Sequence, residues 1–294
     1  MNSHDIILYY KYVHIDDLVA FTACQKKLCT KLGLKGRIII AEEGINGTLE
    51  GTPTTIDAYI QDLKNDPRFA DIHIKRSAGT GRAFPKLSVK ARKEIVSGHL
   101  TDDVNPTEIT GKKLAADDLA KWYEEGKKFT VVDMRNDYEF DVGHFAGSVF
   151  SGMNNFRDLG KVPERIADLK DETVLTVCTG GVRCEKASGY LVKNGFKDVY
   201  QLDGGIVTYM EKYPKGAFKG KLYVFDGRVT MGFDESPDRE VIGKCSLCES
   251  PSELFVNCGN VACNVHFIAC PDCMKNSKAY CSLSCEALCN IPTT

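Results

Sequence analysis

Long apolar runs and an excess of charge of one sign are both absent from this sequence. No segment approaches the roughly 18 uncharged apolar residues that a membrane span requires, and residues 1–5 lack the basic stretch of an export signal. The 38 Lys and Arg nearly balance the 40 Asp and Glu, so the overall charge neither requires nor excludes a nucleic-acid partner. We therefore expect a cytoplasmic protein that contacts no membrane, and nothing indicates a stable protein partner.

The first third of the chain, residues 1–98, has the pattern of a small α+β domain. Apolar runs of strand type alternate with stretches in which apolar residues recur at helical spacing. The expected order is strand, helix, strand, hairpin, helix and strand over residues 6–10, 16–34, 37–41, 43–49, 54–63 and 72–75. The simplest closure of this βαββαβ order is a ferredoxin-like sandwich.

Residues 110–219 show a different pattern, in which short apolar strands alternate with helices. We expect helices over residues 115–125, 162–170 and 184–194, and strands over residues 129–133, 173–178 and 198–202. Strands that are almost wholly apolar are typical of a central parallel sheet that is covered by helices on both faces. This segment therefore predicts an α/β domain.

A cysteine loop joins the second of these strands to the following helix. Cys178 ends the strand and Arg183 precedes the helix; between them stand Thr179, Gly180, Gly181 and Val182. Backbone N–H groups at a helix N-terminus stabilise an anion, so we expect them to lower the thiol pKa of Cys178 below the free value of about 8.5. Cys184 follows at once and is either a small buried residue or a second, resolving thiol.

Four blocks of this segment resemble the rhodanese family in order and spacing. They are residues 131–136, residues 143–148 with Glu139 just before them, the cysteine loop, and residues 202–206. The resemblance implies that Cys178 accepts sulfane sulfur, that Arg183 closes the loop, and that Asp133 and Arg135 form an ion pair or hydrogen-bonding anchor near the pocket. The loop has four residues between Cys and Arg, whereas a related phosphatase loop has five, which argues against phosphate chemistry.

Residues 220–294 hold nine of the thirteen cysteines, all between positions 245 and 289. Two CxxC pairs in so short a segment are typical of structural zinc, which takes four soft ligands in a tetrahedron. The interpretation that we favour places one ion on Cys245, Cys248, Cys270 and Cys273, and a second on Cys258, Cys263, Cys281 and Cys285. His266 is an alternative ligand, iron is an alternative metal, and a metal-free tail is the alternative to both.

The most basic stretch of the chain lies between residues 76 and 98. Its cations are Arg76, Arg82, Lys86, Lys90, Arg92 and Lys93, interleaved with Phe84, Leu87 and Val89. One interpretation is a solvated strand face followed by a linker. The other is a surface that contacts RNA phosphates.

Read together, residues 37–48, 90–96 and 178–188 resemble the bacterial tRNA uridine hydroxylase family. The resemblance implies conversion of the wobble uridine of certain tRNAs to 5-hydroxyuridine with dioxygen, and it makes the tRNA anticodon loop the partner. Bases of a single-stranded loop can be splayed into a pocket. No flavin, haem or other organic cofactor site is recognised in the sequence.

Two other functions remain open at this point. An ordinary rhodanese-type sulfurtransferase would pass sulfur from thiosulfate or a persulfide through Cys178 to a thiol. A noncatalytic, zinc-dependent RNA-binding scaffold would need no reactive cysteine. For the hydroxylase, either Cys178 adds to uridine C6, or a Cys178 sulfenate or persulfide is the oxidant.

Overall fold

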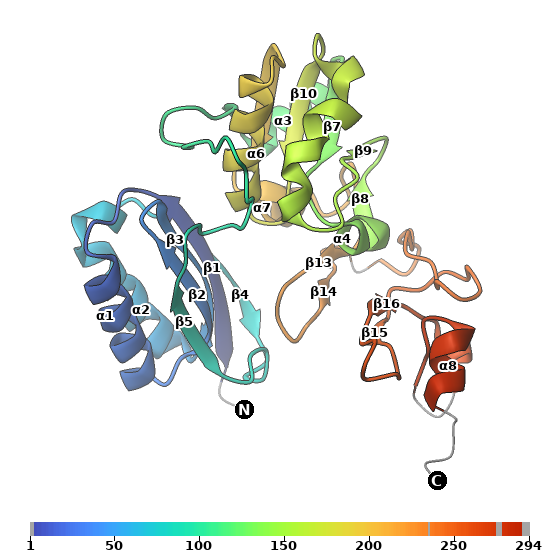
Figure 1. The fold of residues 1–294 in the computed structure, drawn as a ribbon, viewed down its shortest axis with the longest axis horizontal. Coiled ribbons are helices and arrows are strands. Elements are labelled where there is room, and N and C mark those ends of the chain that lie inside the picture. Colours follow the sequence, from blue (N-terminus) through green and yellow to red (C-terminus); the bar gives the residue numbers. More distant parts are fainter. Residues whose placement is uncertain (1–2, 235, 275–277, 290–294) are drawn as a thin grey trace.

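The computed structural model describes residues 3–234, 236–274 and 278–289. It contains an N-terminal sheet with two helices, a second α/β part with a parallel sheet, and a cysteine-rich region at the C-terminal end (Figure 1). This agrees with the α/β class predicted from the sequence. In the described part of the chain no helix is both long and apolar enough to cross a membrane.

The N-terminal part forms a five-stranded sheet in the order β4-β1-β3-β2-β5. Its elements are β1 (His4–Tyr12), α1 (Leu18–Lys31), β2 (Lys35–Ala41), β3 (Gly44–Gly51), α2 (Pro53–Asn65), η1 (Pro67–Phe69), β4 (Ile74–Gly79) and β5 (Leu87–Ala91). The predicted βαββαβ order is confirmed for the first four strands. The fifth strand, β5, pairs in parallel with β2 and was not predicted as a separate strand.

Both helices cover the same face of this sheet (Figure 1). Alternation along the strands places Ile7, Tyr9 and Ile38 in the core with Phe21 of α1 and Tyr59 of α2. The residues between these along each strand point to the other face of the sheet, which the helices leave open. This open face contacts the second α/β part and forms one wall of the site described below.

The second part contains an entirely parallel sheet in the order β6-β11-β10-β7-β9. Its main elements are β6 (Lys112–Leu114), α3 (Ala116–Glu124), β7 (Thr130–Asp133), α4 (Asp137–Val142), β8 (Gly143–Phe145), β9 (Val149–Phe150), β10 (Thr173–Val177), α6 (Val182–Lys193), β11 (Asp198–Leu202) and α7 (Gly205–Lys212). Leu175 and Val177 of β10 belong to one apolar cluster and Val174 to another. The strand is therefore buried on both faces, as its apolar sequence predicted.

The single helix predicted over residues 162–170 is wrong. The chain forms η2 (Phe156–Lys161), α5 (Val162–Arg165) and η3 (Ala167–Leu169), with a break at Ile166, where φ is −116° and ψ is 30°. Val162, Ile166 and Leu169 all point into the core. A one-turn helix followed by a 3₁₀ turn keeps the same side chains on the core side, so apolar spacing does not distinguish it from a continuous helix.

The C-terminal part consists of short pieces. β12 (Phe218–Gly220) pairs with β8, β13 (Leu222–Tyr223) pairs with β14 (Thr230–Met231), and β15 (Phe255–Asn257) pairs with β16 (His266–Ile268); η4 (Pro271–Cys273) and α8 (Leu283–Cys289) follow. Its small core contains cysteines beside Phe267, Ala269 and Ala279. Such a segment has too little apolar surface to be stable by burial alone.

One buried lysine joins the N-terminal sheet to the second part. Lys186 of α6 is fully buried, and its Nζ lies 3.0 Å from Glu43 Oε2 and 3.1 Å from both Glu94 Oε1 and Asp103 Oδ2. Glu43 comes from the turn between β2 and β3, whereas Glu94 and Asp103 come from the connecting segment. Because α6 begins at the cysteine loop, this ion cluster fixes the loop relative to the open sheet face.

Candidate active site

The cysteine loop follows β10 and leads into a helix, as the sequence predicted, but α6 begins at Val182 rather than at residue 184, so Val182 and Arg183 belong to its first turn. Cys178 is fully buried, and the N–H of Gly181 donates a hydrogen bond of 3.3 Å to its Sγ. Gly181 has φ +102°, a conformation that residues with a Cβ rarely adopt, and this turns its N–H toward the sulfur. The loop thus places backbone donors around one sulfur atom at the start of a helix.

The surroundings of Cys178 stabilise a thiolate. Burial raises its pKa, but a hydrogen bond from the Cys184 thiol, the charge of Arg183 and the backbone N–H groups of Cys184 and Gly181 together lower it to about 6. Burial and the adjacent Cys178 sulfur raise the pKa of Cys184 well above its ordinary value. At neutral pH the pair therefore consists of one thiolate, Cys178, and one thiol, Cys184.

Arg183 is held by a carboxylate that the sequence did not assign to it. Its Nη1 and Nη2 donate to Glu139 Oε1 and Oε2 at 2.6 and 2.8 Å, and Nη2 also donates to Thr179 Oγ1 at 3.2 Å. Glu139 is fully buried on the first turn of α4, where it also accepts from the N–H of Asn136. The Asn-x-x-Glu spacing of a capping box was the available sequence signal for that position. Arg183 therefore connects the cysteine loop to α4, through hydrogen bonds from both terminal nitrogens to both oxygens of Glu139.

Asp133 and Arg135 form a fully buried ion pair at the end of β7. Arg135 donates from Nε to Asp133 Oδ1 at 2.9 Å and from Nη2 to Asp133 Oδ2 at 2.7 Å. Nη2 also donates to the carbonyl of Gly143 at 2.6 Å, where β8 begins. Neither residue lines the pocket described below, so the pair anchors the backbone beside the site.

The backbone of the cysteine loop packs against the N-terminus of α7. Ile206 N–H donates to the Cys178 carbonyl at 2.9 Å, and Val207 N–H donates to the Thr179 carbonyl at 3.1 Å. Gly205 permits this approach, because a Cβ at this position would lie 2.6 Å from Gly181 N and 2.7 Å from Cys178 O. This contact gives a structural reason why residues 202–206 and the cysteine loop both belong to the four blocks that resemble the rhodanese family.

The open face of the N-terminal sheet covers the mouth of the loop. Tyr10 donates to Glu185 Oε1 at 3.3 Å, and Lys75 Nζ donates to the Gly180 carbonyl at 2.7 Å. A Cβ on Gly180 would lie 2.9 Å from Leu8 Cδ2. The site is therefore built by two parts of the chain that are far apart in sequence.

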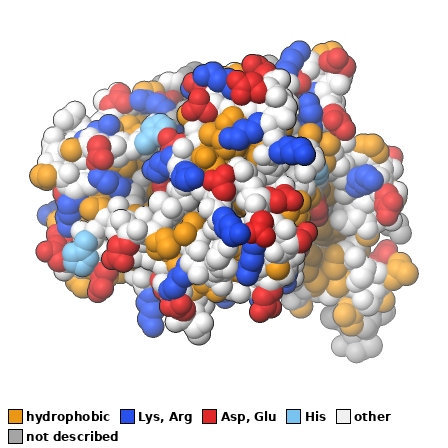
Figure 2. Space-filling view, turned by 90° about the horizontal axis from the view of Figure 1, so that it is seen from above, with side chains coloured by type: hydrophobic (Ala, Val, Ile, Leu, Met, Phe, Trp, Pro, Cys, Tyr) orange, Lys and Arg blue, Asp and Glu red, His pale blue; other side chains and the backbone are white. Residues whose placement is uncertain are grey.

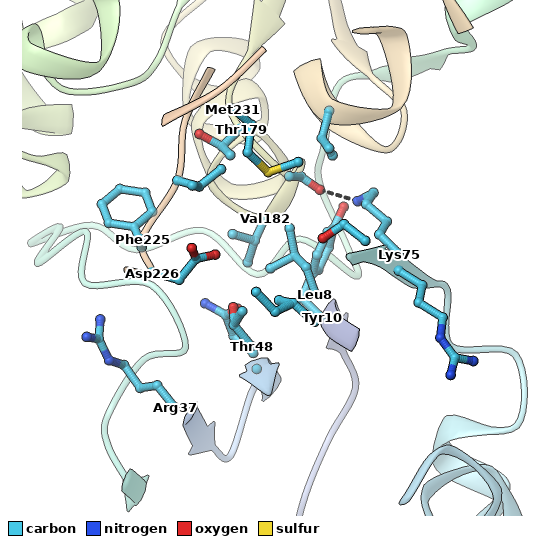
Figure 3. A pocket seen from close by; sticks show the side chains of 18 of the residues that line it. Leu8, Tyr10, Arg37, Thr48, Lys75, Thr179, Val182, Phe225, Asp226 and Met231 are labelled. Atoms are coloured by element: carbon cyan, nitrogen blue, oxygen red, sulfur yellow. Dashed lines mark hydrogen bonds between the residues drawn. The ribbon is translucent and has the colours of Figure 1, made fainter. Parts of the chain in front are cut away.

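A cavity of about 250 Å³ lies between the sheet and the loop (Figure 3). Its walls include Leu8, Tyr10, Lys75, Thr179, Val182, Phe225 and Met231. Small-molecule sites span roughly 300–1,000 Å³, so the space suits one base rather than a length of RNA. Thr179 and Gly180 line the cavity while Cys178 does not, so a bound base reaches the sulfur only after a small displacement of the loop or sheet.

The sequence did not single out Lys75, Leu8 or Tyr10. Lys75 was expected only at the end of a strand over residues 72–75, whereas the structure places it near the start of β4. A lysine among the apolar residues of a strand was the only local signal. The sequence does not show that the open face of this sheet packs on the cysteine loop.

The basic stretch lies on β4, on β5 and in their flanking loops. Arg76 forms ion pairs with Asp5 and Asp57, at 2.5 and 2.6 Å. The other five cations, Arg82, Lys86, Lys90, Arg92 and Lys93, are exposed, and none has an ion pair within the described residues. On the face seen in Figure 2 basic and acidic side chains are interspersed, without an extended basic patch.

The eight predicted cysteine ligands gather in the two predicted groups. The sulfurs of Cys245, Cys248, Cys270 and Cys273 lie within 4.8 Å of one another, and so do those of Cys258, Cys263, Cys281 and Cys285. The Sγ separations of 3.5 Å for Cys248–Cys270 and 3.6 Å for Cys263–Cys281 suit a tetrahedron with metal–sulfur bonds of about 2.3 Å, whose edges are about 3.8 Å.

His266 stands outside both groups. Its ring bonds to Asn257 Oδ1 at 2.7 Å and to the Tyr223 hydroxyl at 3.2 Å. All thirteen cysteines, each within the described residues, are free of disulfides. Both groups can therefore hold metal ions.

Comparison with known proteins matches these three parts to family models. Residues 4–95 match the UPF0176 acylphosphatase like domain, residues 115–212 the rhodanese-like domain, and residues 219–286 the rhodanase C-terminal model. A Bacillus pumilus protein is 47% identical over 97% of this chain and 88% of its own length. A Bacillus velezensis protein is 46% identical over the same shares, and one from Staphylococcus epidermidis is 42% identical over 96% and 89%. Each bears the name tRNA uridine(34) hydroxylase, and the chain therefore belongs to the tRNA uridine(34) hydroxylase family.

Proposed function

We propose that this protein hydroxylates the wobble uridine, position 34 of tRNA, to 5-hydroxyuridine, with dioxygen as the oxygen source and Cys178 as the reacting group. Family membership supports the substrate and the reaction class. The observation that carries the role of Cys178 is its position as a buried cysteine of lowered pKa, directly behind the Thr179 and Gly180 wall of the cavity. A tRNA substrate supports a cytoplasmic location.

The thiolate offers a route to an otherwise unreactive carbon. Addition of Cys178 Sγ to uridine C6 forms an S–C6 bond, and the electron pair of the C5=C6 bond moves toward the C4 carbonyl oxygen. C5 then becomes nucleophilic and can attack an electrophilic oxygen. Transfer of one atom of dioxygen to C5, with the other leaving as water, requires two electrons and two protons from an added reductant. Loss of the C5 proton then expels Cys178 Sγ from C6 and restores the C5=C6 bond. A Cys178 sulfenate or persulfide as the oxidant is the second route.

The test is nucleoside mass spectrometry of tRNA incubated with the purified protein, a thiol reductant and ¹⁸O₂. We expect a gain of one ¹⁸O atom on uridine 34, and no gain under nitrogen. An oxygen gain that comes from H₂¹⁸O rather than ¹⁸O₂ would overturn the role of dioxygen. Absence of any gain with several reductants would overturn the hydroxylase proposal.

Sulfur transfer is the second candidate, because the loop and its thiolate also suit a persulfide. A sulfurtransferase would release thiocyanate from thiosulfate and cyanide at a rate that depends on Cys178. Rapid thiocyanate release without any oxygen gain on uridine would favour this function. Both activities in one preparation would show that the site supports sulfur transfer as well as hydroxylation.

We propose further that the exposed cations of β5 and its flanking loops bind the tRNA backbone. Reversing Arg82, Lys86 and Arg92 to Glu should weaken tRNA binding at least about tenfold and reduce the slope of log K against log salt by about 3. Filter binding across a salt series measures both. The control reverses Lys26, Lys27 and Lys128, which are exposed elsewhere and give the same change in net charge. An equal loss in both triple variants would contradict a localised surface.

The two cysteine groups, we propose, each bind one structural zinc ion. The purified protein should contain about two equivalents of zinc, and Cys270→Ser should retain about one and unfold at a lower temperature. Elemental analysis and thermal denaturation measure these effects. Cys289→Ser is the matched control, since its sulfur lies in the same region but outside both groups. A coloured preparation that contains iron in place of zinc would contradict the choice of metal.

A further inference from the structure

Lys75 is a buried cation with few partners. Its side chain is only 9% exposed and lines the cavity, pointing from β4 toward the cysteine loop (Figure 3). Nζ donates to the Gly180 carbonyl at 2.7 Å and lies 5.7 Å from the centre of the Tyr10 ring. No carboxylate of the described residues forms an ion pair with it. An ammonium group has three donors, and these contacts account for only one conventional hydrogen bond.

The surroundings of Lys75 make its charge costly. Burial lowers its pKa to about 8, while the charges of Cys178, Asp203 and Glu211 oppose this shift. The other titratable groups around it are Tyr10 and His73. A cation that is buried in a cavity without a carboxylate partner is typical of a ligand site, where the ligand supplies the missing acceptor.

We propose that Lys75 selects uracil at position 34 by donating a hydrogen bond from Nζ to O4 of the base in the cavity. This inference rests on the proposed function and names the residue that reads its substrate. The reacting carbon C5 is bonded to C4, which carries O4, whereas C2 and its oxygen lie across the ring. A donor held against the cysteine loop, as Lys75 Nζ is by the Gly180 carbonyl, therefore meets O4 when C5 and C6 face Cys178.

The same contact would reject cytosine. Cytosine carries an amino group at C4, which is a donor, where uracil carries an acceptor. Two donors facing each other leave both without a partner, and at a side chain as buried as Lys75 this costs more than a missing contact at an exposed surface. Lys75 would thus distinguish tRNAs with U34 from tRNAs with C34, which share the same backbone.

Binding of anticodon stem-loop RNAs with U34 or C34 tests the proposal. The wild-type protein should bind the U34 RNA about ten to a hundred times more tightly. Lys75→Met should bring the ratio close to 1, mainly by losing affinity for U34, and Lys75→Arg should keep part of the preference. Lys64→Met removes an exposed lysine from α2, on the far face of the sheet, and should leave the ratio unchanged.

A pH series separates base recognition from a purely structural role. The U34 preference of the wild-type protein should decline as the pH rises above about 8, because Lys75 then loses its proton, whereas that of Lys75→Arg should persist. If Lys75 only ties the loop to the sheet, Lys75→Met will unfold at a lower temperature and keep the wild-type ratio, and the proposal fails. Lys75→Gln replaces Lys75→Met if the latter does not fold.

The two proposals can fail separately. Hydroxylation of U34 by the wild-type protein, with an unchanged U34 preference in Lys75→Met, overturns the role of Lys75 alone. A Lys75-dependent preference for U34 in a protein that forms no hydroxyuridine overturns the reaction and leaves the recognition. Equal binding of U34 and C34 by the wild-type protein also overturns the role of Lys75.

Discussion

Replacing Cys178 with serine will reduce formation of hydroxylated uridine by at least about a thousandfold, while the protein still binds tRNA. The substitution changes one atom in a fully buried position, so the fold should be preserved. It replaces a sulfur that is ionised near neutral pH, with a pKa of about 6, by a hydroxyl that stays protonated. Single-turnover reactions followed by nucleoside mass spectrometry measure the loss, and filter binding measures the retained affinity.

Two other cysteines serve as controls for this result. Cys24→Ser removes an exposed thiol of α1 and should leave the activity unchanged. Cys184→Ser keeps a hydrogen-bond donor beside the Cys178 sulfur but removes the second thiol, so a resolving role would appear as a normal first turnover followed by slow later ones. Full hydroxylation by Cys178→Ser would exclude both the addition route and the oxidised-sulfur route.

Gly205→Ala will destabilise the second part of the chain by about 2–5 kcal/mol and abolish activity. The added Cβ would lie 2.6 Å from Gly181 N, 2.7 Å from Cys178 O and 2.7 Å from Gly180 C. All three are backbone atoms of the cysteine loop, so no side chain can rotate to relieve the contact. Gly205 also has φ +69°. Thermal unfolding and single-turnover activity measure the two effects.

The control for this prediction is Gly195→Ala. Gly195 also has positive φ, +86°, but a Cβ there would meet nothing within 4 Å. Its substitution should cost only the backbone strain, about 1 kcal/mol, and should leave the activity intact. Equal losses of stability in the two variants would show that α7 does not support the loop by close packing.

The sequence predicted those parts of the site that depend on neighbouring residues. Cys178 follows an apolar strand and precedes a helix, and that local order already determines the loop. The cysteine groups could be anticipated because each CxxC turn presents two thiols to one ion. The spacing alone does not determine which pairs share an ion, so the division of the eight cysteines into two groups was a choice among several.

Contacts between distant segments could not be predicted. Arg183 and Glu139 are 44 residues apart, and Lys75 and Gly180 are 105 apart. Both contacts depend on which surfaces pack together, and a single sequence does not record this. The same limit applies to the basic stretch, where Arg76 is paired with Asp5 and Asp57 while Arg82 is not. The spacing of charges along a chain does not show which of them are neutralised.

The close approach of Leu8 to Gly180 has a consequence for how this chain can diverge. Gly180 does not have positive φ, so its backbone alone would tolerate alanine. Only Leu8 Cδ2, 2.9 Å from the position of the missing Cβ, stands in the way. In a free-standing domain of this fold, position 180 could vary alone. In this chain a larger residue at position 180 requires the Leu8 side chain to move or to be replaced by a smaller one, so the two positions are expected to covary across descendants of the same ancestor.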